Sequence, residues 1–561
     1  MNSEKQNAEE SKNSKLTKIK FSIIAITAII IVAMAISPVI LQNDTFYTIK
    51  IGEHIVNTKK VDMVDPFSWH NDLAYTYPHW LYDVFIYLIY AIGGFKGIYV
   101  STIILASILG ITMYFTNCKI TKNRPISFLI TLGSMYLLQS FIAARAQLVT
   151  FILLELVILC IENFLEKKKV IYAAAIVLIS TIIANVHCAV WPFLFVLFLP
   201  YIGEYLIFTI LDWYPIYRIK KQIIKFKFRK DEAKLNERLA ALEKNHNLNK
   251  QKREEAIKNP YKIKYNKNTA CKWLIVIMIV CAFTGLLTPL GDTPYTYLVK
   301  TMQGNTTKSI SEHLPLILIE HKPMLIVLAA IIAILVFTDA KITLKDLFML
   351  GGLALLMFMT RRQASMFVLF GSAIVAKIIA NLLSKYAKDF TPNLEKLSTT
   401  VIGTLVIFAI VCTFSANKFK SKMGQNFINP KTYPVQAAQW IKENLDISSI
   451  RLYNEYNYGS YLLFEGIPVF IDSRADLYAP EFNKRVGEES GRDIFSDYIN
   501  TSQVSTDYEK TFEKYDITHI ILYKKSKTNM LLKKDKDYKE LYADDNFVIY
   551  ERDVTSEEWI N

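Results

Sequence analysis

Residues 21–47 read FSIIAITAIIIVAMAISPVILQNDTFY, and this stretch decides the fold class. The run from Phe21 to Leu41 contains no charged residue, and a helix of that length crosses the ~30 Å hydrocarbon core of a bilayer. The run is also too long for the apolar core of a signal peptide. We therefore expect a retained membrane helix at about 20–41, with the Lys-containing tail of residues 1–19 in the cytoplasm.

Similar apolar runs recur along most of the chain, of which 52% is hydrophobic. Ten more runs predict spans at 98–115, 126–142, 147–165, 170–187, 191–211, 273–288, 324–338, 346–360, 366–383 and 399–415. The core of a soluble protein does not contain so many long, uninterrupted apolar runs. The sequence therefore predicts a polytopic α-helical membrane protein with about eleven transmembrane helices between residues 20 and 417, and it excludes a soluble enzyme.

The positive charge is concentrated in one connection between two spans. Residues 218–272 hold 18 Lys or Arg and 6 Asp or Glu, a surplus of 12 in a chain whose net charge is +14. Loops rich in Lys and Arg stay in the cytoplasm, so the loop 212–272 is predicted to lie inside and to contact anionic lipids. Within it, the alternating charges of Asp231–Ile257 predict a solvated helical hairpin. No base-reading module accompanies this charge, which argues against nucleic acid as a partner.

The second apolar segment, His79–Gly93, is short and carries Asp83 and several aromatic residues. We interpret it as an interfacial helix within a first outer loop, residues 42–97. Treating it as a span would put the basic residues between 119 and 124 outside, against the positive-inside rule.

The composition changes after about residue 417, and the odd number of spans places residues 418–561 outside. Val435–Leu445 is predicted to be an amphipathic helix. Four short buried strands are predicted at Ser449–Tyr453, Val469–Asp472, His519–Tyr523 and Phe547–Tyr550. Strands alternating with helices indicate a soluble extracytoplasmic α/β domain. None of the six cysteines lies in it, which argues against a disulfide framework.

Asp44 directly follows the first membrane helix. At that depth a carboxylate costs free energy unless it is solvated, ion-paired or has a function in binding or catalysis. At the outer surface it could accept a proton from a hydroxyl group while a lipid-linked donor lies in the adjacent bilayer. Tyr47, about one helical turn later, would share its face. The alternative is that Asp44 caps the next helix and Tyr47 anchors it at the interface.

These residues resemble the GT-C class of membrane glycosyltransferases, which use polyprenyl-phosphate-linked sugars. The matching motifs are Asp44-x-x-Tyr47, Gly52-Glu53, Asp65-Pro66-Phe67-Ser68, Tyr77-Pro78-His79-Trp80 and the run Leu88–Gly94. The likeness is greatest to bacterial glycosyltransferase-39-like proteins that carry a C-terminal extracytoplasmic domain. The resemblance implies that Asp44 is the catalytic carboxylate and that Tyr47, Asp65 and His79 line the substrate site.

The chain also departs from that pattern. Many relatives have a Lys and paired prolines before the surface helix, where this chain has Tyr77-Pro78-His79, so the donor-phosphate contact stays unassigned. Only one acid directly follows the first span, so no metal-binding pair is evident. The sequence makes no cofactor certain, and it leaves a divalent metal open.

Further polar residues are predicted at the outer ends of the spans. Arg145, Arg361 and Arg362 run against the positive-inside bias, and a lipid phosphate or pyrophosphate would explain them because guanidinium binds phosphate bidentately. Gln147 and His187 would complete this substrate-binding set. Ion pairs with acids or headgroups are the alternative for the arginines, and a helix-end hydrogen bond is the alternative for His187.

In the outer domain, Tyr458 and Arg474 follow predicted strands and Asp472 ends one, at positions where α/β folds tend to place ligand sites. They are weak candidates for binding the acceptor, and a satisfied internal ion-pair network is the alternative for Asp472 and Arg474.

The leading hypothesis is a multi-pass plasma-membrane glycosyltransferase with Asp44 as general base. It would move a sugar from a polyprenyl-phosphate donor to a glycan, lipid or protein acceptor at the outer face. A transporter or flippase for lipid-linked precursors is the second hypothesis, and a non-catalytic membrane scaffold is the third.

Overall fold

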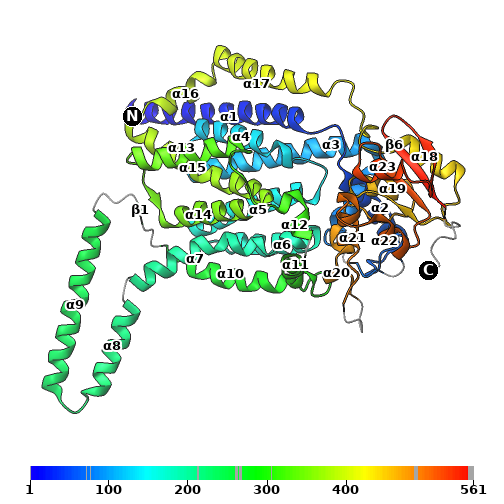
Figure 1. The fold of residues 1–561 in the computed structure, drawn as a ribbon. Helices are drawn as coiled ribbons and strands as arrows, with labels where there is room; N and C mark the ends of the chain where they lie inside the picture. The colour runs from blue at the N-terminus through cyan, green and yellow to red at the C-terminus, as the bar shows by residue number, and fades with distance from the viewer. Residues whose placement is uncertain are drawn as a thin grey trace.

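The computed structural model describes residues 2–70, 73–75, 77–211, 214–258, 263–264, 268–304, 306–484 and 490–553. Parts of the predicted basic loop (212–213, 259–262 and 265–267) and the end of the predicted outer domain (554–561) therefore lie outside the described residues. The chain forms a bundle of helices lying side by side, and a mixed unit of helices and strands covers one end of the bundle (Figure 1).

The bundle and its connections comprise α1 to α17. Their bounds are α1 Asn2–Ile36, α2 Asn43–Thr58, α3 Trp80–Thr121, α4 Arg124–Leu138, α5 Ala146–Lys167, α6 Val170–Val186, α7 Phe193–Leu211, α8 Tyr214–Lys227, α9 Glu232–Lys258, α10 Cys271–Thr284, α11 Thr293–Gln303, α12 Thr306–Ser309, α13 Lys322–Phe337, α14 Leu344–Met359, α15 Ala364–Tyr386, α16 Phe390–Ser398 and α17 Val401–Lys422. Two-residue strands β1 (Ile263–Lys264) and β2 (Ile342–Thr343) pair in parallel between them.

Each of the eleven predicted apolar runs falls on a helix. Within the described residues, six helices are long and apolar enough to cross a membrane, and α6, α10 and α13 are shorter apolar helices. The most apolar stretch of α17 is only 11% buried, and Val401, Ile402 and Leu405 are exposed on it. Such a surface suits lipid and not water, so the structure supports a helical membrane protein.

The first outer loop is helical in two places. Residues 43–58 form a regular helix, α2, which the sequence analysis considered only in the capping alternative for Asp44. The predicted interfacial helix and the span after it are joined into one helix, α3, which breaks at Gly94 (φ 57°, ψ −151°). A positive φ is readily adopted only by glycine, so Gly94 marks the boundary that the sequence analysis placed there.

The close contact between α2 and the first part of α3 depends on Gly52. A Cβ built at Gly52 would meet the backbone carbonyl of Asp83 and would lie 2.6 Å from the Cβ of Tyr87. Backbone cannot yield as a flexible side chain does, so α2 would have to move away from α3.

We expect Gly52→Ala to lower stability by about 1–3 kcal/mol through this overpacking. The matched control is Gly133→Ala in α4, where an added Cβ meets nothing within 4 Å and alanine favours the helix. The unfolding temperatures of both variants in detergent test this. Equal temperatures for the two variants would contradict the proposed close approach.

The basic loop forms a long hairpin of α8 and α9, which leaves the bundle at the end opposite the mixed unit (Figure 1). The sequence predicts a hairpin inside Asp231–Ile257, but that stretch is a single arm. No glycine or proline interrupts it, and the Asp231 side chain accepts a hydrogen bond from the backbone N–H of Lys234 (3.2 Å), which caps the start of α9.

The C-terminal unit comprises the described residues from Phe427 onward. Its strands are β3 Leu452–Tyr453, β4 His519–Tyr523, β5 Tyr538–Ala543 and β6 Phe547–Arg552, in the sheet order β3-β4-β6-β5. β3 and β4 are parallel, and the other two pairs are antiparallel. Its helices are α18 Val435–Asn444, α19 Tyr456–Phe464, α20 Pro480–Asn483, α21 Ile494–Gln503, α22 Tyr508–Lys514 and α23 Lys527–Leu532.

Helix α18 and strands β3, β4 and β6 lie where the sequence predicts them. The prediction of a strand at Val469–Asp472 is wrong, since only Val469 forms an isolated bridge, with Ser68. The reason is that side chains take the backbone bonds of this segment: Asn454 bonds the N–H of Phe470 (2.8 Å) and the carbonyl of Ile471 (2.7 Å). The edge strand β5 was not predicted because Lys539 and Glu540 interrupt its apolar residues, and only Tyr538 at its start is buried.

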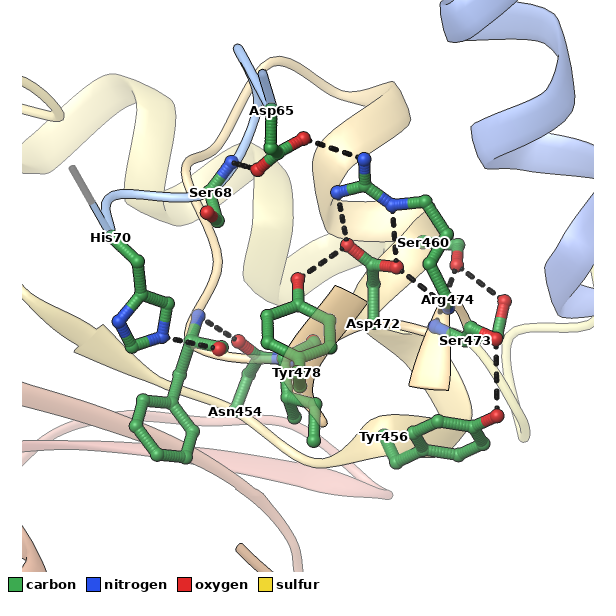
Figure 2. Close-up of polar contacts among 12 residues, drawn as sticks. Asp65, Ser68, His70, Asn454, Tyr456, Ser460, Asp472, Ser473, Arg474 and Tyr478 are labelled. Atoms are coloured by element: carbon green, nitrogen blue, oxygen red, sulfur yellow. Dashed lines mark hydrogen bonds and ion pairs between the residues drawn. The ribbon is translucent and has the colours of Figure 1, made fainter. Parts of the chain in front are cut away.

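An ion-pair network joins the first outer loop to the C-terminal unit (Figure 2). The guanidinium of Arg474 contacts Asp65 (2.5 Å) and binds Asp472 through two nitrogens (2.6 and 2.9 Å). These three side chains are at most 1% exposed. Tyr478 donates to Asp472 (2.7 Å), and the backbone N–H of Ser68 donates to Asp65 (2.8 Å), so the network is closed and well satisfied.

Aromatic packing extends the same junction. Trp69 donates its indole N–H to the carbonyl of Leu452 (3.0 Å). Phe46 of α2 packs edge-on against Tyr433 (5.0 Å between ring centroids) and Tyr461 (5.2 Å) of the C-terminal unit. The C-terminal unit is therefore fixed against α2 and the loop that follows it.

Candidate active site

Asp44 lies in the first turn of α2, at the end of the bundle that carries the C-terminal unit. The residue at the N-cap position is Gln42, and no side chain caps the helix. Asp44 instead forms an ion pair with Arg145, and its side chain keeps 23% of its surface exposed. The capping alternative is thus not the arrangement observed, and the carboxylate remains accessible.

Arg145 precedes α5 and lies between two carboxylates. Besides Asp44, it binds Glu312 of the short helix η3 (Ser311–His313) at 3.1 Å. Burial alone would lower the pKa of Arg145, but Asp44 and Glu312 outweigh it and raise that pKa. The Nε of Arg145 is buried without a hydrogen-bond partner among the described residues, so one guanidinium donor remains to be satisfied.

His79 connects Tyr47 to a buried carboxylate. The hydroxyl of Tyr47 lies 3.1 Å from Nε2 of His79, and Nδ1 of His79 lies 2.7 Å from Asp83. Burial disfavours the charged imidazole, but the charge and hydrogen bond of Asp83 outweigh this and raise the pKa of His79. Burial raises the pKa of Tyr47 well above its usual value, so this residue stays a neutral phenol.

This arrangement predicts a pH-dependent contribution to stability. The folded-state pKa of His79 is above its usual 6.5, so its contribution is complete below that value and is lost as the pH rises through the folded pKa. Asp83→Asn removes the largest causes that raise the pKa of His79, so burial, which lowers that pKa, outweighs the smaller opposing charge of Asp44. We expect this variant to be destabilised by about 1–3 kcal/mol at acidic pH and less at alkaline pH.

Unfolding temperatures on both sides of neutrality test this. The control is Asp62→Asn, which removes a half-exposed carboxylate 3.0 Å from His54 and is expected to have little effect at any pH. A loss in Asp83→Asn that is independent of pH would contradict the assignment.

His187 lies between α6 and the short helix η2 (Cys188–Val190), and its ring centroid is 6.3 Å from that of His79. The Thr150 hydroxyl donates to the carbonyl of Ala146 (2.9 Å), so it accepts from Nδ1 of His187 (3.2 Å). With its proton on Nδ1, the neutral imidazole keeps the Nε2 lone pair available to a ligand.

Neighbouring arginines at the start of α15 differ in their partners. Arg361 in the short helix η4 (Arg361–Gln363) contacts Glu320 (3.2 Å) and the carbonyl of Pro315 (3.4 Å). Arg362 has no carboxylate within ion-pair distance among the described residues. Its charge nevertheless adds to the effect of burial in lowering the pKa of His313. With Arg145, it also lowers the pKa of Glu312, so Arg362 acts on this cluster without a direct ion pair.

The C-terminal unit adds the carboxylate of Asp476 to the site. Asp476 in the short helix η5 (Ala475–Tyr478) accepts a hydrogen bond from the hydroxyl of Tyr297 in α11. Burial raises the pKa of Asp476, while Arg362 and His79 are among the charges that act against this rise. Asn43 of α2 also contacts the C-terminal unit, since it donates to the carbonyl of Tyr456 (2.9 Å). The candidate site therefore lies where the bundle meets the C-terminal unit.

The structure brings five predicted site residues to this place: Asp44, Tyr47, His79, Arg145 and His187, with Arg362 acting electrostatically on them. Gln147 is buried nearby in α5. Asp65, Asp472 and Arg474 instead form the buried network of Figure 2. Tyr458 is buried inside the C-terminal unit, where it donates to the carbonyl of Ile521 (2.8 Å).

The sequence analysis assigned no site role to Asp83. A local signal for it exists, since Asp83 is four residues after His79 and shares its helical face. Among the residues that the structure describes, no group of three or more His, Cys, Asp or Glu is arranged to hold a metal ion.

Comparison with known proteins identified no related protein. No family model matches the chain, and no curated protein is similar enough to be recognised as related.

Proposed function

We propose that this chain is a membrane glycosyltransferase of the GT-C type, which transfers a sugar from a polyprenyl-phosphate donor to an acceptor hydroxyl at the outer face. The observation that carries the proposal is the accessible Asp44 carboxylate, held beside Arg145 at the end of the bundle. Arg362, which forms no ion pair among the described residues, acts on the same cluster through its charge. A carboxylate base next to a guanidinium group that keeps one free N–H donor suits an acceptor hydroxyl and a phosphate leaving group.

The proposed topology has about eleven spans, with the N-terminus inside and the C-terminal unit outside. Figure 1 supports it, because the N-terminus and the basic α8–α9 hairpin lie at one end of the bundle and the C-terminal unit at the other. The positive-inside rule assigns the hairpin end to the cytoplasm. The candidate site then faces the outside of a plasma membrane.

The first part of α3 offers a path for the polyprenyl chain. Leu81, Phe85, Leu88 and Ile92 are exposed on it at helical spacing, so they form one apolar stripe. In an interfacial helix this stripe would contact lipid. The donor's chain could then remain in the bilayer while its phosphate reaches the arginines.

In the proposed reaction, the acceptor hydroxyl gives its proton to Asp44 while its oxygen bonds to the anomeric carbon of the donor sugar. The bond between that carbon and the phosphate oxygen breaks, and polyprenyl phosphate leaves. Arg362 and the free Nε of Arg145 would stabilise the charge that develops on the phosphate. Neutral His187 can accept a hydrogen bond from the sugar or the acceptor through Nε2.

The adjacent arginines provide a test of donor binding. We expect Arg362→Gln to weaken binding of a polyprenyl-phosphate sugar by roughly 10–100-fold, the loss of a hydrogen bond to a charged group. Arg361→Gln is the matched control, because Arg361 already pairs with the exposed Glu320, and a small effect is expected. Binding to the full chain in nanodiscs, over a panel of donor sugars, measures both.

Turnover separates the proposal from its alternatives. Release of polyprenyl phosphate with formation of a glycosylated acceptor supports the glycosyltransferase. Binding with movement of the donor across the bilayer, without release, would instead identify a transporter. Absence of donor binding across the panel, or equal effects of the two arginine variants, would reject the proposed site.

A further inference from the structure

Helix α8 of the α8–α9 hairpin has two different faces, one toward α9 and one away from it. Tyr217, Lys221 and Ile224 of α8, and Phe228 just after its end, are half-buried and lie on the face toward α9. The ring of Tyr217 stacks on His246 of α9 at 4.3 Å. This face holds the two arms together.

The opposite face of α8 carries three large apolar side chains. Ile219, Ile223 and Phe226 are 59%, 56% and 75% exposed, and their spacing of four and three residues places them in one stripe along the helix. The stripe lies about half a turn away from the residues that face α9. The guanidinium of Arg229 lies over the ring of Phe226, 5.5 Å from its centroid, but all three side chains of the stripe remain more than half exposed. The stripe is therefore an apolar surface that can bind a partner.

Basic residues border this stripe on both sides. At 100° per residue, Lys220 and Lys227 fall on one flank, and Arg218 and Lys225 on the other. All four are exposed. Helix α8 contains no acidic residue, whereas α9 mixes acidic and basic residues along its length. The excess of positive charge therefore surrounds the apolar stripe.

The position of α8 agrees with this arrangement. The hairpin leaves the bundle after α7, and α8 is the arm nearer the bundle while α9 is the outer arm (Figure 1). The face of α8 that turns away from α9 is therefore directed toward the plane where lipid surrounds the bundle. An apolar stripe between two rows of cations fits the boundary between acyl chains and anionic headgroups.

We infer that α8 docks on the adjacent, cytoplasmic lipid surface, with Ile219, Ile223 and Phe226 among the upper acyl chains and the flanking Lys and Arg at anionic phosphates. The occupant of this face is thus the bilayer that surrounds the protein. The inference does not depend on glycosyl transfer, since it would hold for a transporter or a scaffold with the same hairpin.

Quenching by brominated lipids tests this docking in the full chain. A fluorophore is attached to a cysteine introduced by Ile223→Cys, in a background whose six native cysteines are replaced by alanine. The matched control is Leu248→Cys, an apolar position of α9 that is 48% exposed. Both proteins are placed in nanodiscs whose lipids carry bromine near the headgroup end, with and without phosphatidylglycerol.

We expect strong quenching at 223 and little at 248, with quenching at 223 reduced when phosphatidylglycerol is absent. Lys220→Gln with Lys225→Gln should shift the equilibrium toward the unquenched state by roughly fivefold for each cation removed. Equal quenching at the two positions, or insensitivity to both the lipid charge and the lysine changes, would overturn the inference. Crosslinking of position 223 to a second copy or to another protein would also overturn it.

Discussion

Asp44→Asn is expected to lower glycosyl transfer by about 10²–10⁴-fold, the contribution of a positioned general base. The amide cannot accept the acceptor's proton, although it keeps the size and hydrogen-bonding shape of the carboxylate. The chain should stay folded, because Arg145 retains Glu312 as a partner 3.1 Å away. Initial rates of sugar transfer by the purified full chain, together with its elution in size exclusion, provide the measurement.

Two further variants distinguish a base from a structural partner of Arg145. Glu312→Gln removes the other carboxylate that binds Arg145, and we expect it to lower transfer by less than about tenfold because no proton is moved to it. Asp292→Asn changes an exposed acid before α11 and should have no effect. Equal losses in Asp44→Asn and Glu312→Gln would assign Asp44 to positioning Arg145 and would contradict its role as base.

Arg474→Ala is expected to destabilise the chain by about 3–5 kcal/mol, because it leaves two carboxylates buried without their cation. Both Asp65 and Asp472 have side chains with no exposed surface. The variant should also loosen the C-terminal unit from the first outer loop, since Arg474 connects them (Figure 2). A lower unfolding temperature and faster proteolysis within the C-terminal unit are the expected readouts.

Arg451→Ala is the matched control for this prediction. Arg451 is 44% exposed and lies 3.1 Å from Asp516, which is 81% exposed, so its ion pair is worth little in water. We expect a change below about 1 kcal/mol. Similar unfolding temperatures for the two arginine variants would show that the buried network does not hold the units together.

The helices of the bundle could be predicted from the sequence because their signal is local. A run of about 20 apolar residues identifies a helix for the bilayer without any knowledge of its neighbours. The edge strand β5 and the segment Val469–Asp472 depend on partners elsewhere in the chain. The side chain of Asn454 forms hydrogen bonds with the backbone of Val469–Asp472. The residue pattern within the segment does not indicate these bonds.

Only the site residues with a local signal could be predicted from the sequence. Asp44, His79 and His187 stand out because polar groups at the ends of apolar helices need a reason. The contact of Arg474 with Asp65 joins residues 409 positions apart, so one sequence gives no sign that these side chains pair with each other. The contribution of Asp476 likewise depends on how the C-terminal unit sits on the bundle.

The side of the membrane on which each end of the bundle lies is the premise of the proposed function. Cysteines introduced singly at Glu53, a half-exposed residue of α2, and at Glu237, an exposed residue of α9, can be labelled with a membrane-impermeant maleimide in the cysteine-free background. We predict that position 53 reacts in intact cells and that position 237 reacts only after lysis. Labelling of position 237 in intact cells, with position 53 protected until lysis, would place Asp44 in the cytoplasm and contradict the account.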